Sequence, residues 1–270
     1  MDLLEKYATR LRHYPGLRSL PIWSLMRVCF LRFYWGRGIE RILNGSVSIR
    51  LDPRLRTVSE SYEVPVWHDL ISNVREGDLV VDVGAYIGLY TIPLAKRAGA
   101  NGRVIAFEPD PESRGWLSRN VSLNRLSERV EIHAEALGAT KKEILFCGGE
   151  GPLSQINPDV PGEMRVKMLT LDEVISGRAV DYMKIDVEGY EGEVLQGAAR
   201  LMRDPARYPR KIYVEVHPDN WKRHGWSDRR LLDLLAECGY RVTTIAGSPV
   251  EEIKLYGEIV AGKERARPIP

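Results

Sequence analysis

Short runs rich in valine and isoleucine recur along the chain from about residue 64 and alternate with stretches of helical periodicity. The apolar runs predict strands at 79–83, 103–107, 129–133, 180–186, 211–217 and 240–245. Helical patterns cover 111–124, 191–202 and 227–238. The last of these begins with Ser227 and Asp228, which are typical of an N-cap and a first helical turn. This alternation predicts an α/β fold, in which helices cover both faces of a parallel sheet.

Two segments depart from this alternation. At helical spacing after Pro21 lie the apolar residues Ile22, Leu25, Met26, Cys29, Phe30 and Phe33. We therefore expect residues 1–60 to form a helical extension and residues 61–270 to form the main domain. The extension could pack on that domain, cover the substrate as a lid, form a homodimer contact or lie on a membrane surface. Residues 143–170 combine glycines and prolines with short apolar runs, which indicates a hairpin-like insertion near the mouth of the sheet.

Charge is distributed unevenly along the 270 residues. The whole chain has a formal charge of +2, whereas residues 1–60 hold eleven basic and five acidic side chains and so carry +6. A basic extension that follows the phosphates of a nucleic acid would show binding that falls steeply with salt. The aromatic residues of that segment fit an amphipathic core pattern instead, so we expect no nucleic-acid partner.

Composition indicates an ordinary globular protein. Hydrophobic residues make up 44% of the chain and charged residues 28%. The most apolar early stretch is interrupted by Arg27 and Arg32 and is too short for a transmembrane segment. The N-terminus lacks a signal-peptide pattern, and the three cysteines have no paired or metal-ligand spacing. We therefore expect a cytoplasmic protein.

The run LVVDVGAYIGLYT at 79–91 places a glycine turn between a predicted strand and a predicted helix. In open α/β sheets, ligands bind outside the carboxyl ends of the strands, commonly at the first such turn. Gly84 would allow close approach of a ligand and Gly88 close helix packing, while Asp82 could accept hydrogen bonds. The spacing is G-x-x-x-G, which favours a pyrophosphate less than the G-x-G-x-x-G of dinucleotide folds.

Glu108 ends the next predicted strand, about 20 residues after the glycines. A carboxylate at this position can accept hydrogen bonds from both hydroxyls of a ribose. The turn and Glu108 together predict a nucleoside-bearing cofactor.

These residues resemble the FkbM-type methyltransferases. The resemblance rests on VVDVGAYIGLYT, VIAFEPDPES with NVSLN, MLTLDEVI, KIDVEGYEGEVLQGA and YVEVHP, and covers about residues 60 to 260. It implies a Rossmann-like class I methyltransferase sheet with an antiparallel last strand. It also implies that S-adenosylmethionine donates a methyl group to a hydroxyl of a sugar, polyketide or similar small molecule.

The resemblance also implies roles for single residues. It assigns Glu108 to the ribose. From its place at the carboxyl end of its predicted strand, we expect Asp186 also to lie close to the cofactor. Tyr86 stands where family members often have a smaller polar residue, which puts its own contact in doubt. The methionine part would be lined by Asp82, Gly84, Ala85, Tyr86 and Gly88, and the adenine would lie near Asp110, Glu135 and Ala136.

An alcohol acceptor needs a base at the carboxyl ends of strands near this turn. Residues 184 and 186 share one face of their strand, as do 215 and 217. A register with an offset of 31 would pair Lys184 with Glu215 and Asp186 with His217. We expect His217 to be the general base, oriented by Asp186. The alternative is that the four charged residues only neutralise one another.

Other functions remain open at this level. Asp186, Glu188 and His217 could hold Mg²⁺, which would acidify a bound hydroxyl. Glu108 would also fit an NAD-linked oxidoreductase. A third alternative is a non-catalytic nucleoside-binding domain.

Overall fold

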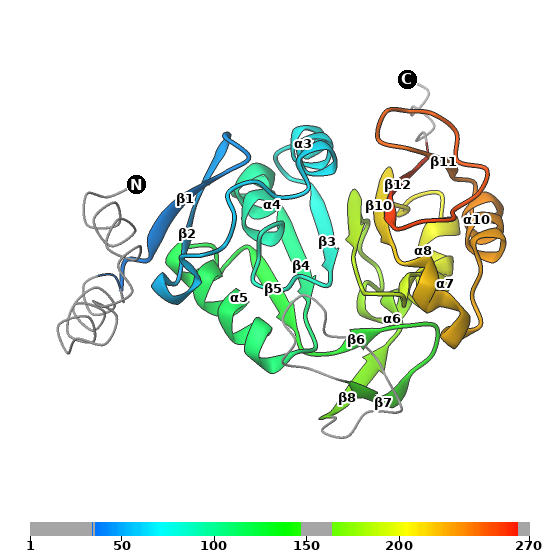
Figure 1. Cartoon of the computed structure of the whole chain (residues 1–270), viewed down its shortest axis with the longest axis horizontal. Helices are drawn as coiled ribbons and strands as arrows, with labels where there is room; N and C mark the ends of the chain where they lie inside the picture. The colour runs from blue at the N-terminus through cyan, green and yellow to red at the C-terminus, as the bar shows by residue number, and fades with distance from the viewer. Residues whose placement is uncertain (1–33, 35, 147–163, 264–270) are drawn as a thin grey trace, which may run out of the picture.

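A seven-stranded sheet forms the centre of the molecule (Figure 1). The computed structural model describes residues 34, 36–146 and 164–263. The strand order is β11-β12-β10-β9-β3-β4-β5. All neighbouring strands are parallel except β12, which is antiparallel to β10 and β11. The strands are β3 (Leu79–Val83), β4 (Arg103–Phe107), β5 (Val130–His133), β9 (Tyr182–Ile185), β10 (Lys211–Val216), β11 (Arg241–Thr243) and β12 (Gly257–Gly262). The predicted α/β class and the antiparallel strand near the end of the chain are confirmed.

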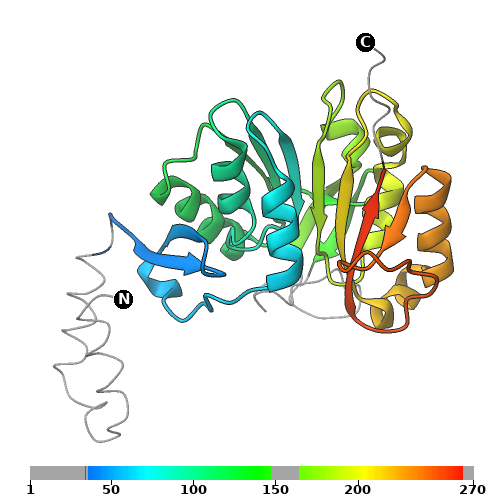
Figure 2. The same ribbon diagram turned by 90° about the horizontal axis from the view of Figure 1, so that it is seen from above.

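Helices cover both faces of this sheet, as Figures 1 and 2 show. Alternate side chains along each strand enter different cores. Val81 and Val83 pack in one core, whereas Val80 packs in the other. The first core contains residues of α6 (Leu171–Val174), α7 (Glu191–Gly197), α8 (Ala199–Arg203), α9 (Pro218–Trp221) and α10 (Asp228–Glu237). The second contains residues of α3 (Val64–Asn73), α4 (Thr91–Ala98) and α5 (Pro111–Leu123).

The chain passes from β3 outward to β4 and β5, and later returns to β9 on the other side of β3. The crevice of an open α/β sheet lies at this kind of reversal, outside the carboxyl ends of the strands. The topology therefore brings the ends of β3, β9 and β10 to one edge.

The described part of the extension differs from the predicted helix. Residues Ile39–Leu43 (β1) and Val47–Leu51 (β2) form an antiparallel hairpin, followed by the 3-10 helix η2 (Pro53–Leu55). Asn44 and Gly45 both have positive φ at its turn, and an Asn-Gly pair between apolar runs is a hairpin signal. The apolar helix expected after Pro21 lies outside the described residues, so its lid, dimer and membrane roles stay predictions.

This hairpin packs on α5. The backbone N–H of Asp52 donates to Asn120 Oδ1 at 2.8 Å, and Asn120 Nδ2 donates to the carbonyl of Ile87 at 2.9 Å. Asn120 is fully buried, so one side chain joins the hairpin to the glycine turn.

The insertion after β5 forms a second small sheet. Its strands are β6 (Ala136–Leu137), β7 (Lys142–Phe146) and β8 (Met164–Leu169), and β7 and β8 are antiparallel. The expected hairpin is therefore present. Across the described ranges, the helices are all too short or too polar to cross a membrane.

Candidate active site

The glycine turn follows β3 and lies against the ends of β4 and β9. The backbone N–H groups of Gly84 and Ala85 both donate to the carbonyl of Phe107 at 3.0 Å. Gly84 has φ +84°, and a Cβ added there would lie 1.7 Å from the carbonyl oxygen of Asp186. Gly88 has φ +95°, and its Cβ would lie 2.9 Å from Leu117 Cδ1 of α5. Gly88 therefore permits close helix packing, and Gly84 permits a close approach between two strand ends.

We expect Gly84→Ala to lower the free energy of unfolding by about 3 kcal/mol or more, because it adds a left-handed backbone penalty to a backbone clash. Gly115→Ala is the matched control. Gly115 lies exposed in α5 with open space around its Cβ, so alanine should leave stability unchanged or raise it by up to about 1 kcal/mol. Urea unfolding of both variants measures the difference. Equal changes in the free energy of unfolding for the two variants would contradict the close packing at Gly84.

Glu108 fixes the conformation of the turn. Its Oε2 accepts the backbone N–H of Tyr86 at 2.7 Å, and its Oε1 accepts that of Asp110 at 2.9 Å. The side chain is buried, and burial raises its pKa to about 7 although both backbone donors lower it. Tyr86 has φ +48°, so Glu108 stabilises a backbone conformation that non-glycine residues rarely adopt. Since a carboxylate has about four lone-pair sites, Glu108 can still accept from a ribose.

The residues expected near the adenine have local roles of their own. Asp110 is the N-cap of α5 and accepts from Ser113 N at 3.1 Å. Glu135 lies 3.6 Å from His133 Nδ1, and Ala136 begins β6. All three lie at the carboxyl ends of β4 and β5, and their adenine contacts stay predictions.

A cavity lies between the glycine turn, β9 and the segment before α3. Asp82 is one of the buried residues that line this cavity, and it accepts a hydrogen bond from Thr91 Oγ1 at 2.5 Å. Burial raises the pKa of Asp82 to about 6. Burial also raises the pKa of Asp186. Such carboxyl groups favour a cationic ligand, because a nearby positive charge stabilises their ionised form. The lining residues are Tyr62, Asp82, Gly84, Ala85, Tyr86, Leu89, Tyr90, Lys184 and Asp186.

Lys184 is the buried cation of this site. Its Nζ lies 3.3 Å from Glu215 Oε2, 3.4 Å from Glu63 Oε2 and 3.9 Å from Asp186 Oδ2. The side chain is 2% exposed. Burial lowers its pKa, but Asp186, Glu63 and Glu215 outweigh burial and hold the pKa above the ordinary value.

The predicted strand register is wrong. Lys184 faces Tyr213 across β9 and β10, so the offset is 29 instead of 31. Lys184 still reaches Glu215 because a long side chain can contact the next residue on the same face of a neighbouring strand. Asp186 and His217, both described by the structure, share no hydrogen bond or ion pair. Asp186 therefore makes no direct contact that would orient the His217 ring, although the sequence analysis expected one.

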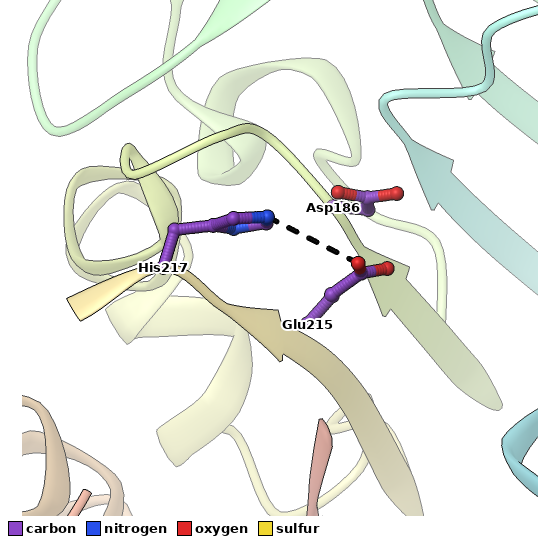
Figure 3. Close-up of side chains that lie close together, drawn as sticks. All are labelled: Asp186, Glu215 and His217. Atoms are coloured by element: carbon purple, nitrogen blue, oxygen red, sulfur yellow. Dashed lines mark ion pairs between the residues drawn. The ribbon is translucent and has the colours of Figure 1, made fainter. Parts of the chain in front are cut away.

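His217 follows β10 and lies among three glutamates. Its Nδ1 lies 2.7 Å from Glu191 Oε1, and its Nε2 lies 3.4 Å from Glu188 Oε2 and 4.0 Å from Glu215 Oε1. Burial lowers the pKa of His217, but the hydrogen bond and charge of Glu191, with the charges of Glu188 and Asp186, raise it to about 9. Figure 3 shows His217 and Glu215 projecting from β10 toward Asp186 at the end of β9. The imidazole thus lies at the same strand edge as the cavity.

Several residues at this site were missed by the sequence analysis. Glu63 and Tyr90 share a hydrogen bond of 2.8 Å beside Lys184. Tyr256 donates to Glu215, and its ring lies 5.3 Å from that of His217. Glu191 belongs to the KIDVEGYEGEVLQGA run, so its motif was visible although its role was not. Glu63 and Tyr256 lie far from any such motif.

The sheet order, the glycine turn and the acidic strand edge together define a Rossmann-like nucleotide-cofactor fold of the class I methyltransferase type. The Methyltransferase FkbM domain model matches residues 82–242. The chain belongs to this family of methyltransferases, whose class uses S-adenosylmethionine.

Relatives with assigned activities match part of the chain. The hexuronic acid methyltransferase AglP of Haloferax volcanii is 28% identical over 157 residues, which cover 55% of this chain and 59% of AglP. The 31-O-demethyl-FK506 methyltransferase FkbM of Streptomyces tacrolimicus is 30% identical over 183 residues, which cover 53% of this chain and 67% of that enzyme. A SAM-dependent O-methyltransferase from Thermotoga maritima superposes with a TM-score of 0.47 at 16% identity, covering 80% of this chain and 71% of that one.

Proposed function

We propose that this protein transfers a methyl group from S-adenosylmethionine to a hydroxyl of a small molecule, sugar or glycan. The observation that carries the proposal is a shared strand edge. The cavity beside the glycine turn and the His217 imidazole are joined there through Lys184, Glu215 and Asp186. The AglP and FkbM relatives support an oxygen-bearing acceptor, because their names describe a hexuronic acid and a demethylated FK506.

The residues of the cavity fit the proposed cofactor. S-adenosylmethionine, when bound, supplies an electrophilic methyl group on a cationic sulfur. Asp82 and Asp186 would face its sulfonium and ammonium groups, whose positive charge would favour the ionised form of these buried carboxyl groups, and Glu108 has acceptor capacity for its ribose hydroxyls. Tyr62 and Tyr90 add aromatic side chains to the lining of this cavity.

His217 is the proposed base. Its Nε2 would accept the hydroxyl proton as the acceptor oxygen attacks the methyl carbon and the carbon–sulfur bond breaks. Glu188 and Glu191 would stabilise the imidazolium that forms. Lys184 would hold Glu215 and Asp186 in place during this step.

Calorimetric titration tests the cofactor. We expect S-adenosylmethionine and S-adenosylhomocysteine to bind and NAD⁺ to give no heat. Glu108→Gln should weaken both sulfur nucleosides by about tenfold or more, since it exchanges a carboxylate acceptor for an amide. Glu112→Gln is the control, because it removes the charge of another acidic side chain close by, in the first turn of α5. Binding of NAD⁺ alone would favour the oxidoreductase alternative, and binding without turnover of any acceptor would favour the non-catalytic one.

The alternative of a metal-assisted reaction rests on one observation. Asp186, Glu215 and His217 each offer a ligand atom, and these atoms lie within 4.8 Å of one another. This set contains Glu215 where the sequence suggested Glu188. Lys184 already places an ammonium against both carboxylates of this set, so we propose that it neutralises them and that the reaction needs no divalent ion. Turnover lost with EDTA and restored by Mg²⁺ would overturn this.

A further inference from the structure

We infer that Glu191 is a positioning residue that holds the His217 imidazole with Nε2 facing the acceptor. The inference rests on the proposed function, because it gives His217 the base role. Neither the expected pairing of Asp186 with His217 nor the motif itself assigns this role to Glu191.

Glu191 is fully buried, and each of its oxygens has defined donors. Oε1 accepts the backbone N–H of Gly189 at 2.9 Å and faces His217 Nδ1 at 2.7 Å. Oε2 accepts the indole N–H of Trp221 at 2.6 Å. The relative exposed area of Glu191 is 0%. A buried carboxylate with donors on both oxygens has one orientation, so it can fix the ring that it contacts.

This contact determines which imidazole nitrogen can act. An ionised carboxylate only accepts hydrogen bonds, so Nδ1 must carry the proton that faces Glu191. When the ring is neutral, its lone pair is then on Nε2. Nε2 faces Glu188 Oε2 at 3.4 Å and Glu215 Oε1 at 4.0 Å, on the side of Asp186. Glu191 therefore selects the tautomer whose free nitrogen, Nε2, lies on the side of Asp186.

The turn between β9 and α7 makes this arrangement rigid. Glu188 has φ +52° and Gly189 has φ +107°. A Cβ at Gly189 would lie 2.3 Å from Asn220 Cβ, and Asn220 Nδ2 donates to the carbonyl of Glu188 at 3.2 Å. Strained backbone of this kind is found where a site needs it. One turn thus places Glu188 on Nε2 and Glu191 on Nδ1.

The proposed reaction requires a free Nε2 on the His217 ring. The acceptor O–H bond breaks and its proton goes to Nε2, an oxygen–methyl bond forms, and the carbon–sulfur bond breaks with its electron pair left on sulfur. The Nδ1 proton stays on the ring throughout. The resulting imidazolium has Glu191 on one side and Glu188 on the other.

The chain offers a matched control on the same helix. Glu193 Oε1 accepts the indole N–H of Trp226 at 3.0 Å, just as Glu191 accepts that of Trp221. Within the described part of the chain, Glu193 shares no hydrogen bond or ion pair with His217. Glu193→Gln therefore makes the same carboxylate-to-amide exchange beside an indole without touching the imidazole.

The test is ¹⁵N NMR of the full chain labelled at histidine, with the His217 signal assigned by its loss in His217→Gln. In the wild type and in Glu193→Gln, we expect the neutral ring to be protonated at Nδ1. In Glu191→Gln, we expect a mixture of tautomers and a titration midpoint that moves from about 9 toward the ordinary value near 6.5. Glu188, Glu215, Asp186 and Tyr256 also face this ring and stay unchanged in that variant.

Turnover is measured with S-adenosylmethionine and a panel of methyl glycosides. We expect Glu191→Gln to lower kcat by about tenfold or more and to move the pH profile to lower pH, with Glu193→Gln within about twofold of the wild type. An unchanged tautomer and midpoint in a folded Glu191→Gln variant would overturn the inference. The NMR result requires no acceptor, so it can fail or succeed independently of S-adenosylmethionine binding and turnover, which test the proposed function.

Discussion

Replacement of Lys184 by methionine is expected to lower the free energy of unfolding by about 3–5 kcal/mol. The ammonium lies within 3.4 Å of carboxylates from Glu63 and Glu215 and is 2% exposed. Methionine fills a similar volume but leaves these carboxylates buried without their shared cation. The loss is measured by urea unfolding at pH 7.5, followed by intrinsic fluorescence.

Lys211→Met is the matched control on the neighbouring strand. Lys211 Nζ pairs with Asp69 Oδ2 at 3.0 Å, but both side chains are about one-third exposed. Pairs with this exposure typically contribute about 0–1 kcal/mol. A Lys184→Met variant no less stable than the Lys211→Met variant would show that the carboxylates have other means of neutralisation, such as protonation.

Replacement of His217 by glutamine is expected to lower the rate of methyl transfer by about 10²–10⁴, which is the usual contribution of a general base. Glutamine has no basic nitrogen but can keep hydrogen bonds to Glu188 and Glu191. Binding of S-adenosylmethionine should be unchanged, since His217 does not line the cavity beside the glycine turn. Single-turnover assays with a saturating acceptor measure the loss.

The pH dependence separates a base from a structural residue. The pKa of His217 is raised to about 9, so the neutral ring is a minor form at pH 7 and its fraction grows as pH rises toward 9. In the wild type, kcat/KM should therefore increase with pH over this range, and the increase should vanish in His217→Gln. His224→Gln is the control, because burial lowers the pKa of His224 and its ring packs on Tyr190 at 4.6 Å. A fall of less than tenfold in His217→Gln would favour mutual neutralisation of the four charged residues over the base role.

The sequence alone determined the elements that local periodicity encodes. The runs 79–83 and 103–107 are strands with the predicted bounds, and α10 begins after its predicted cap, Ser227. The glycine turn was also predictable, because positive φ and close packing restrict the residue type at Gly84. The hairpin at 39–51 was missed although Asn44 and Gly45 signalled it, because the helical pattern before residue 34 was extended across it.

The tertiary structure decided which side chains meet. An alternating strand pattern fixes the face on which Lys184 and Glu215 lie, but it leaves the offset between strands open by steps of two residues. Packing of β9 between β3 and β10 selected an offset of 29. That choice, with the left-handed turn at Glu188, placed Glu191 instead of Asp186 on His217. Glu63 reached Lys184 from a segment more than a hundred residues away, and no local pattern encodes such a contact.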